Sequence, residues 1–475
     1  MIPSTLFHPL PPAQLAELAE RHARQCSERG AVVRKPDGTI APIPPLLTPR
    51  VLTRAQRTAM EGAAHALVAA LTRVSRWLMR DAQAELRERL FHSFTPLEAR
   101  ALSSYRSAEN LATARVDFVL DGAGHPRALE VNATIPAMQG YADIVAESFL
   151  ETVGRARGKS HEEIAALVAA NGRNTDDLLA SLLGHYRRLG GDAPVPSIAI
   201  VHRPGDAQLG ELEHYARRWS ELGHPTLLAT PEETCLMNGR LQFRSEPRDL
   251  VYRHVFARRL DPECDFARAC FTPERHYILN PIASHLEVKG LLALLSQAAD
   301  RPQLATEMDL DGEMVTAAAQ TLPWTRLLDR QTVAETLAHP ERYVIKRSWD
   351  YGGRSVFLGS DFDEGDARRA ADVLDRKEPL RWSQLVEAAA QDPRDLWVVQ
   401  ERIVFPPEQH LIATREGPRS CQVYLDCSIY TNLGVAVHPS GGAARAAPGK
   451  IVNILGGGGL APLILDEVVA ALLSP

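Results

Sequence analysis

The apolar positions of the first hundred residues follow the spacing of α-helices. After a proline-rich stretch at 41–50, apolar residues recur at helical intervals, at Met60, Leu67, Leu71, Val74 and Leu78. Residues 95–98 read Thr-Pro-Leu-Glu, a capping-box pattern with proline at the first helical position, so a further helix should begin there. The pattern predicts a mostly helical scaffold up to about residue 110.

Two short runs of alternating apolar and polar residues follow, at 115–120 and 128–132, on either side of the turn-rich stretch DGAGHPR. They predict an antiparallel hairpin with a long loop. Because side chains alternate between the faces of a strand, one face should carry Val116, Phe118, Leu120, Leu129 and Val131. The opposite face should carry Arg115, Asp117, Glu130 and Asn132.

The middle of the chain shows a β-α-β pattern. Residues 197–201 read as a buried strand, 209–222 as a helix and 226–229 as a second strand, which predicts a small parallel sheet. The stretch 230–233, Thr-Pro-Glu-Glu, repeats the helix-start pattern, and 250–252 reads as a further strand.

These elements divide the chain into three predicted regions of a mixed α/β fold. Residues 1–155 form a helical region plus the hairpin, 156–290 a small α/β domain, and 291–475 a third region that ends in a glycine-rich loop. The strands expected in the third region are 343–346, 396–400 and 422–430.

Size, charge and cysteine content exclude several classes of protein. The chain has 475 residues and a net charge of −6, which argues against a disulfide-stapled miniprotein and a dedicated nucleic-acid binder. Its six cysteines form no CxxC pair, as expected for reduced thiols. We find no signal-peptide pattern and no apolar run of membrane-spanning length, so we expect a soluble, cytoplasmic protein without a membrane or nucleic-acid partner. His202, His254 and His285 lack zinc-ligand spacing and are expected to be structural.

The polar face of the predicted hairpin is the first candidate for chemistry. Glu130 and Asn132 lie two residues apart on one strand, and a carboxylate with an amide oxygen suits a hard cation such as Mg²⁺. A solvated strand face would show the same pattern.

The stretch 343–354 is the second candidate. A predicted strand ends near Lys346, Asp350 follows, and Gly352 and Gly353 form a turn whose backbone N–H groups could approach phosphate oxygens. A plain β-turn with surface charges is the alternative. No P-loop motif occurs in the chain.

Two further stretches add to this picture. Residues 396–403 form an apolar strand with a polar end, which is either a nucleotide-binding hinge or an ordinary core strand. The stretch 441–459 carries Arg445, Lys450 and Asn453 before the glycine run 456–459. It is either a loop that closes over a ligand or a flexible surface loop. Arg445 could hold a carboxylate or a phosphate.

Taken together, these motifs resemble the ATP-grasp ligases. In most of that family the E-x-N motif follows the hinge, whereas here it precedes the other motifs, an order similar to that of the circularly permuted, eukaryotic-type glutathione synthetases. The matching segments are ARVDF, LEVNATI, HLEVKGL, VIKRSWDYGG, VVQERI and AARAAPGKIVNILGGGG. The resemblance extends over roughly residues 41–465.

The resemblance implies a permuted ATP-grasp fold and roles for individual residues. The implied magnesium ligands are Glu130, Asn132 and Asp350. The implied ATP-binding residues are Lys289, Lys346, Gly352, Gly353, Gln400, Glu401, Ile403 and Lys450. The implied substrate-binding residues are Arg115, Arg253, Arg445 and Asn453, and of these residues Arg115, Lys346 and Arg445 are implied to be catalytic.

The resemblance further implies an ATP- and Mg²⁺-dependent carboxylate–amine ligase that acts on amino acids or peptide-like molecules, and a homodimer. The chain has Ile135, Pro136 and Ala137 where the family places substrate-binding serines, and Phe256 where a tyrosine is expected. Each lost hydroxyl would leave a buried polar group unpaired, at a cost of about 1–3 kcal/mol, which indicates a substrate other than γ-glutamylcysteine. The alternatives are a phosphotransferase and a non-catalytic nucleotide-binding module.

Overall fold

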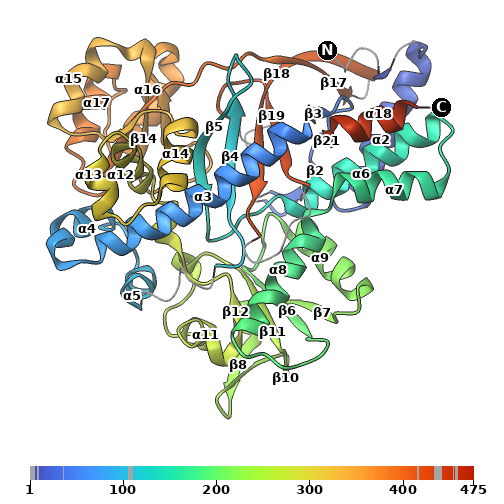
Figure 1. Cartoon of the computed structure of the whole chain (residues 1–475), viewed down its shortest axis with the longest axis horizontal. Coiled ribbons are helices and arrows are strands. Elements are labelled where there is room, and N and C mark those ends of the chain that lie inside the picture. Colours follow the sequence, from blue (N-terminus) through green and yellow to red (C-terminus); the bar gives the residue numbers. More distant parts are fainter. Residues whose placement is uncertain are drawn as a thin grey trace.

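The protein has a mixed α/β fold with several sheets, seen in a computed structural model that describes residues 6–7, 10–35, 37–104, 111–414, 417–432, 441–452, 454 and 458–474. Its centre is an antiparallel sheet ordered β20-β19-β18-β4-β5, with β17 paired to β18 (Figure 1). These strands are β4 (Arg115–Leu120), β5 (Pro126–Asn132), β17 (Glu408–Thr414), β18 (Gly417–Tyr430), β19 (Ala443–Ala447) and β20 (Gly459–Ala461). The sheet therefore joins the predicted hairpin to strands from the far end of the chain.

Helix α3 (Arg54–Leu78) runs across the central sheet (Figure 1). A capping box at Thr53 and Gln56 begins it, and the apolar row from Met60 to Leu78 is buried in the largest core cluster. The neighbouring helices are α4 (Ala84–Leu90), α5 (Pro96–Ser104), α12 (Lys289–Ala299), α13 (Pro302–Glu307) and α14 (Gly312–Thr321). The helix predicted to begin at Pro96 is confirmed.

A second antiparallel sheet, ordered β13-β16-β14-β15, stands beside the central one. Its strands are β13 (Thr325–Leu327), β14 (Tyr343–Arg347), β15 (Val356–Leu358) and β16 (Trp397–Glu401). Helices α15 (Arg330–Ala338), α16 (Glu364–Val373) and α17 (Trp382–Ala390) share a core with it. The strands predicted at 343–346 and 396–400 are thus neighbours in one sheet.

The small parallel sheet predicted in the middle of the chain is confirmed, with the order β12-β11-β6-β7. Its strands are β6 (Ile198–His202), β7 (Thr226–Ala229), β11 (Leu250–His254) and β12 (Ile278–Leu279). Helices α8 (Asn174–Arg188) and α9 (Leu209–Glu221) pack on one face. The other face is covered by apolar residues that include Leu97, Leu241 and Phe266, so β6 and β11 are buried on both faces and are apolar except at their ends, at His202, Arg253 and His254.

The helix predicted to begin at 230–233 is wrong. A single 3-10 turn, Pro231–Glu233, leads instead into a small antiparallel sheet of β8 (Thr234–Met237), β9 (Arg240–Phe243) and β10 (Glu246–Pro247). Asn238 and Gly239 join β8 to β9 with positive φ values of 52° and 73°. An Asn-Gly pair favours this tight hairpin turn, which stops helix growth.

The remaining elements form a helical layer beyond the central sheet (Figure 1). Its helices are α2 (Pro12–Glu28), α6 (Gln139–Ala156), α7 (His161–Asn171) and α18 (Asp466–Leu473). Strand β3 (Arg50–Leu52) pairs in parallel with β21 (Leu463–Leu465), and β1 (Val32–Arg34) pairs with β2 (Ile40–Pro42). Two short helices, α10 (Asp265–Ala269) and α11 (Pro273–His276), contact strands of the two small sheets. In the described part of the chain no helix is both long and apolar enough to cross a bilayer.

Candidate active site

A pocket lies where the central sheet meets the second sheet, and most of the predicted site residues line it. Those that do are Glu130, Lys289, Lys346, Asp350, Gly353, Gln400, Glu401, Ile403, Arg445 and Lys450. Arg115, Asn132, Gly352 and Arg253 do not line the pocket themselves, although the first three adjoin lining residues. Asn453, Gly456 and Gly457 lie outside the described residues, so the predicted lid function of the glycine run stays a prediction.

The predicted faces of the hairpin need one correction, at Leu129. Asp117 pairs with Glu130, but Phe118 pairs with Ala128, so a β-bulge at this point adds one residue to β5. Because a bulge breaks strict alternation, Leu129 joins Glu130 in lining the pocket, and Ala128 takes its place in the core. The bulge therefore puts an apolar side chain beside the acidic one.

Lys346 projects from β14 into the buried part of the pocket. Its Nζ donates a 2.6 Å hydrogen bond to Gln400 Oε1 and a 3.4 Å bond to the carbonyl of Leu129. Gln400 in turn donates to Thr325 Oγ1 at 3.0 Å. Burial lowers the pKa of Lys346 to about 8, against the opposing charge of Glu130 and with a smaller lowering by Lys289. Lys346 therefore loses its proton, and its positive charge, in mildly alkaline solution.

This lowered pKa predicts pH-dependent binding of an anionic nucleotide. ATP should bind tightly while Lys346 is protonated, and its affinity should fall as the pH rises through about 8 and more Lys346 becomes neutral. Titration calorimetry of ATP from pH 7 to pH 10 would measure this loss. Lys346→Arg keeps its charge over the whole range, so its affinity should not change there; the same decline in that variant would contradict the assignment.

Lys289 connects the two parts of the pocket. Its Nζ lies 3.7 Å from a carboxylate oxygen of Glu130 and donates a 2.9 Å hydrogen bond to the carbonyl of Asp350. The Asp350 carboxylate accepts hydrogen bonds from the Tyr351 N–H and from the Ser355 hydroxyl. Glu130 and Asp350 therefore flank the same ammonium group, although 220 residues separate them in the chain.

The glycine turn after Lys346 has the conformation that its sequence requires. Gly352 and Gly353 have φ values of 66° and 72°, and a Cβ atom on Gly353 would lie 2.6 Å from Ile451. A side chain at position 353 would therefore clash as well as strain the backbone. The close approach of Ile451 brings the segment that carries Lys450 over the turn.

The donor set around Glu130 fits a hard cation. Asn132 donates through Nδ2 to Asp117 at 3.3 Å, which leaves its amide oxygen as a possible ligand. Glu130 is 32% exposed at its side chain, so its carboxylate can reach solvent and a cation. Among the described residues, no group of three or more His, Cys, Asp or Glu side chains is arranged to hold a metal. A site here would need the amide of Asn132 and oxygens from a bound ligand.

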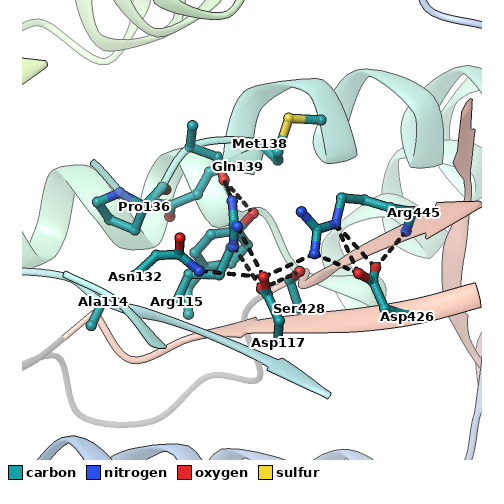
Figure 2. Close-up of polar contacts among 12 residues, drawn as sticks. Ala114, Arg115, Asp117, Asn132, Pro136, Met138, Gln139, Asp426, Ser428 and Arg445 are labelled. Carbon is teal, nitrogen blue, oxygen red and sulfur yellow. Dashed lines mark hydrogen bonds and ion pairs between the residues drawn. The ribbon is translucent and has the colours of Figure 1, made fainter. Parts of the chain in front are cut away.

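Two arginines and two aspartates form a buried network (Figure 2), and three of them line the pocket. Asp117 accepts bonds from Arg115 at 2.7 and 3.0 Å and from Arg445 at 2.8 Å. It also accepts a 2.8 Å bond from Ser428 Oγ. Arg445 pairs with Asp426 through its Nε at 3.0 Å, and Arg115 donates to the carbonyl of Ala137 at 2.9 Å.

The charges of this network balance one another. Burial opposes the ionisation of Asp117, but Arg115 and Arg445 outweigh it and lower the pKa of Asp117. Although burial opposes the charge of Arg445, Asp117 and Asp426 raise the pKa of Arg445 well above its usual value. Burial raises the pKa of Asp426. Of the four residues, only Arg115 is absent from the pocket lining.

Asp426 was not identified from the sequence, and Asp117 was placed on the polar face without a role. A usable signal exists in the stretch YLDCSIY, where one charged residue interrupts a long apolar strand. A charge in a buried strand needs a partner of opposite charge. The sequence does not show which cation supplies it.

Arg253 binds backbone carbonyls in this fold. It is fully buried and donates to the backbone carbonyls of Asn280, Pro281, Val255 and Thr134. It thereby ties β11 to the segment after β12 and to the turn after β5. Its predicted contact with a substrate carboxylate stays untested, but its guanidinium is already engaged by four acceptors.

Comparisons with known proteins show which solved structures this fold resembles. No protein-family model and no curated protein sequence matches the chain. A glutathione synthetase-like effector from Globodera pallida, in its apo form, superposes with a TM-score of 0.62 at 14% identity, over 96% of this chain and 98% of its own. A protein from Methylobacillus flagellatus, provisionally named γ-glutamylcysteine synthetase, aligns over 86% of this chain and 87% of its own at 11% identity. Its TM-score of 0.38 is too low to support an argument.

The likeness to the Globodera protein confirms the predicted glutathione synthetase-like fold over nearly the whole chain. The identity is too low to carry over an activity. The ATP-grasp architecture and its circular permutation stay predictions.

Proposed function

We propose that the protein is an ATP-dependent carboxylate–amine ligase with a permuted ATP-grasp fold, which forms an amide through an acylphosphate. The observation that carries the proposal is the composition of the pocket. Three ammonium groups, Lys289, Lys346 and Lys450, line it together with several carboxylates, which include those of Glu130 and Asp350. Apolar side chains line the pocket as well, among them Val119, Leu129, Val344, Ile403 and Phe405. Cations for phosphates beside an apolar surface for a base suit a nucleoside triphosphate.

Amide formation from a free carboxylate needs activation, which explains the need for ATP. A carboxylate resists attack by an amine because its oxygen is a poor leaving group. Transfer of the γ-phosphoryl group to the carboxylate turns that oxygen into phosphate, a good leaving group. The amine then forms the C–N bond as the C–O bond to phosphate breaks, which yields ADP, phosphate and the amide.

The lysines of the pocket serve phosphoryl transfer by neutralising charge. Lys346 is held by Gln400 and the Leu129 carbonyl, and Lys289 by the Asp350 carbonyl, so both ammonium groups are fixed before a substrate arrives. Fixed charges in a buried site stabilise a charged transition state more than mobile ones in water do. Glu130, Asp350 and the amide oxygen of Asn132 would hold Mg²⁺, which supplies a Lewis acid for the phosphate oxygens.

Arg445 is the arginine of the network that reaches the pocket. Two aspartates fix its guanidinium, so it is aligned for a substrate carboxylate or for the oxyanion of the reacting carbon. Arg115 lies behind Asp117 and holds that carboxylate in place. In this proposal Arg445 contacts the substrate and Arg115 positions Asp117.

An ADP-release assay with pairs of carboxylates and amines tests the proposal. The panel would contain the amino acids and γ-glutamyl dipeptides, with ATP and Mg²⁺. We expect ADP, phosphate and an amide product in equal amounts for at least one pair. A stable phosphorylated product would instead show a phosphotransferase, and ATP binding without ADP release across the panel would show a non-catalytic nucleotide-binding protein.

A further inference from the structure

Glu287 is a buried carboxylate with one satisfied oxygen and one unsatisfied oxygen. Its Oε1 accepts hydrogen bonds from the N–H groups of Ala133 and Thr134, at 2.7 and 2.5 Å. Its Oε2 is buried and has no hydrogen-bond partner, and the residue is 7% exposed. Buried polar atoms in folded proteins are nearly always paired, so an unpaired carboxylate oxygen points to a missing partner.

A second unsatisfied atom lies close by. The hydroxyl of Tyr351 is buried without a partner, while Tyr351 itself lines the pocket. After burial, the charge of Glu287 is the strongest influence that raises the pKa of Tyr351, as expected when the two groups are neighbours. The Tyr351 ring packs on Phe256, with the ring centroids 4.8 Å apart.

The neighbouring cations are engaged elsewhere. Lys289 is bonded to the Asp350 carbonyl and paired with Glu130, and Arg253 is bonded to backbone carbonyls. Burial accordingly raises the pKa of Glu287 to about 7, although the two N–H groups, the Thr134 hydroxyl and Lys289 act in the opposite direction. The side chain thus keeps an acceptor free for a cation from outside the protein.

We propose that Glu287 and Tyr351 form a subsite for a protonated amino group of a substrate, beside the nucleotide pocket. An ammonium group carries a positive charge and three N–H donors, so it can pair with Oε2 of Glu287 and with the Tyr351 hydroxyl at once. This inference rests on the proposed function only for the identity of the reaction. The subsite lies next to Lys289 and Asp350, so it would orient the substrate toward the phosphoryl group.

Direct binding tests the subsite independently of catalysis. The probes are the amino acids and γ-glutamyl dipeptides, each with its N-acetylated counterpart, titrated into the whole protein by calorimetry. Glu287→Gln keeps an acceptor for the Ala133 and Thr134 N–H groups but loses the charge. We expect it to weaken binding of the free amine about tenfold or more, as loss of a hydrogen bond to a charged group implies, and to leave the acetylated form unchanged.

Two further variants sharpen this experiment. Tyr351→Phe removes the hydroxyl and keeps the ring against Phe256. It should weaken the binding of the same amines, by a smaller factor than Glu287→Gln does. Glu313→Gln, an exposed residue in the first turn of α14, is the control of equal charge change and should bind as the wild type does. The proposed subsite is refuted if the binding of no probe depends on both its free amino group and Glu287. It is also refuted if Glu287→Gln weakens the binding of ATP to the same extent as that of the amines.

Kinetics then identify which substrate carries the amino group. Hydroxylamine is uncharged near neutral pH and captures an acylphosphate as a hydroxamate. If the ammonium belongs to the attacking amine, Glu287→Gln should slow amide formation but leave hydroxamate formation intact. If it belongs to the acid, Glu287→Gln should slow both amide and hydroxamate formation. A desamino acid, such as glutarate in place of glutamate, should then remove the difference in rate between wild type and variant. Wild-type protein that binds these amines through Glu287 without ADP release would refute the ligase and keep the subsite.

Discussion

Glu130→Ala is expected to reduce ADP release by about a hundredfold or more, because loss of a group that orders a metal site already costs about 10- to 100-fold. The Glu130 carboxylate lines the pocket, where its charge acts on Lys289 and Lys346. Without it the Mg²⁺-bound phosphates lose a ligand and the two lysines lose their counter-charge. The measurement is the steady-state rate of ADP release at saturating ATP and Mg²⁺.

The fold should tolerate this change, which separates catalysis from stability. The Glu130 side chain is 32% exposed, and the buried Lys289 and Lys346 keep other hydrogen-bond acceptors, so removal should cost less than the about 3–5 kcal/mol expected when a buried ion pair is broken. Glu130→Gln keeps the size of the side chain and should lose activity nearly as fully. Full activity in either variant, with an unchanged melting temperature, would exclude Glu130 as a metal ligand.

The same variant has a second readout at Lys346. The charge of Glu130 raises the pKa of Lys346 against the effect of burial. Its removal should therefore lower that pKa further below about 8. The alkaline decline in ATP affinity should begin at a lower pH in Glu130→Ala than in the wild type, and calorimetry would show the difference.

Asp117→Ala is expected to destabilise the protein strongly, by about 3–5 kcal/mol, because it leaves buried positive charge without its partner. Asp117 is 1% exposed and accepts bonds from Arg115, Arg445 and Ser428. Arg445 would keep Asp426, whereas Arg115 would lose both of its bonds to a carboxylate. The measurement is urea-induced unfolding of the whole chain near neutral pH.

A matched control and a pH series make this prediction specific. Glu467→Ala removes a carboxylate from an exposed pair with Arg54 and should leave the unfolding free energy nearly unchanged. Because Arg115 and Arg445 lower the pKa of Asp117, its contribution is present above the carboxyl's ordinary pKa and is lost as the pH falls through the lowered value. The difference in unfolding free energy between wild type and Asp117→Ala should therefore persist in mildly acid solution. An equal effect of both substitutions would refute the role of the network.

Local sequence patterns were sufficient for most secondary structure and for part of the site. The capping pattern at 95–98 and the alternation around 115–120 depend on neighbours a few residues away, so the chain itself carries the information. Glu130, Lys346 and Gly353 were found for the same reason, since each stands at a strand or turn that its own flanks define.

Where the prediction failed, distant parts of the chain or one extra residue decided the outcome. The bulge at 117/118 moved Leu129 to the pocket, because one inserted residue reverses the facing of what precedes it. The Asn-Gly turn at 238–239 converted a predicted helix into a hairpin.

The sequence by itself determined the element types, the parallel small sheet and the kinds of side chain that chemistry would need. Only the tertiary structure decided that β4 and β5 would share a sheet with β18 and β19, and so that Asp117 would meet Arg445 and Asp426. Strand pairing over some 300 residues depends on the burial of whole faces rather than on any local signal. The partners of a buried charge are therefore fixed by the fold, while the charge itself is visible in the sequence.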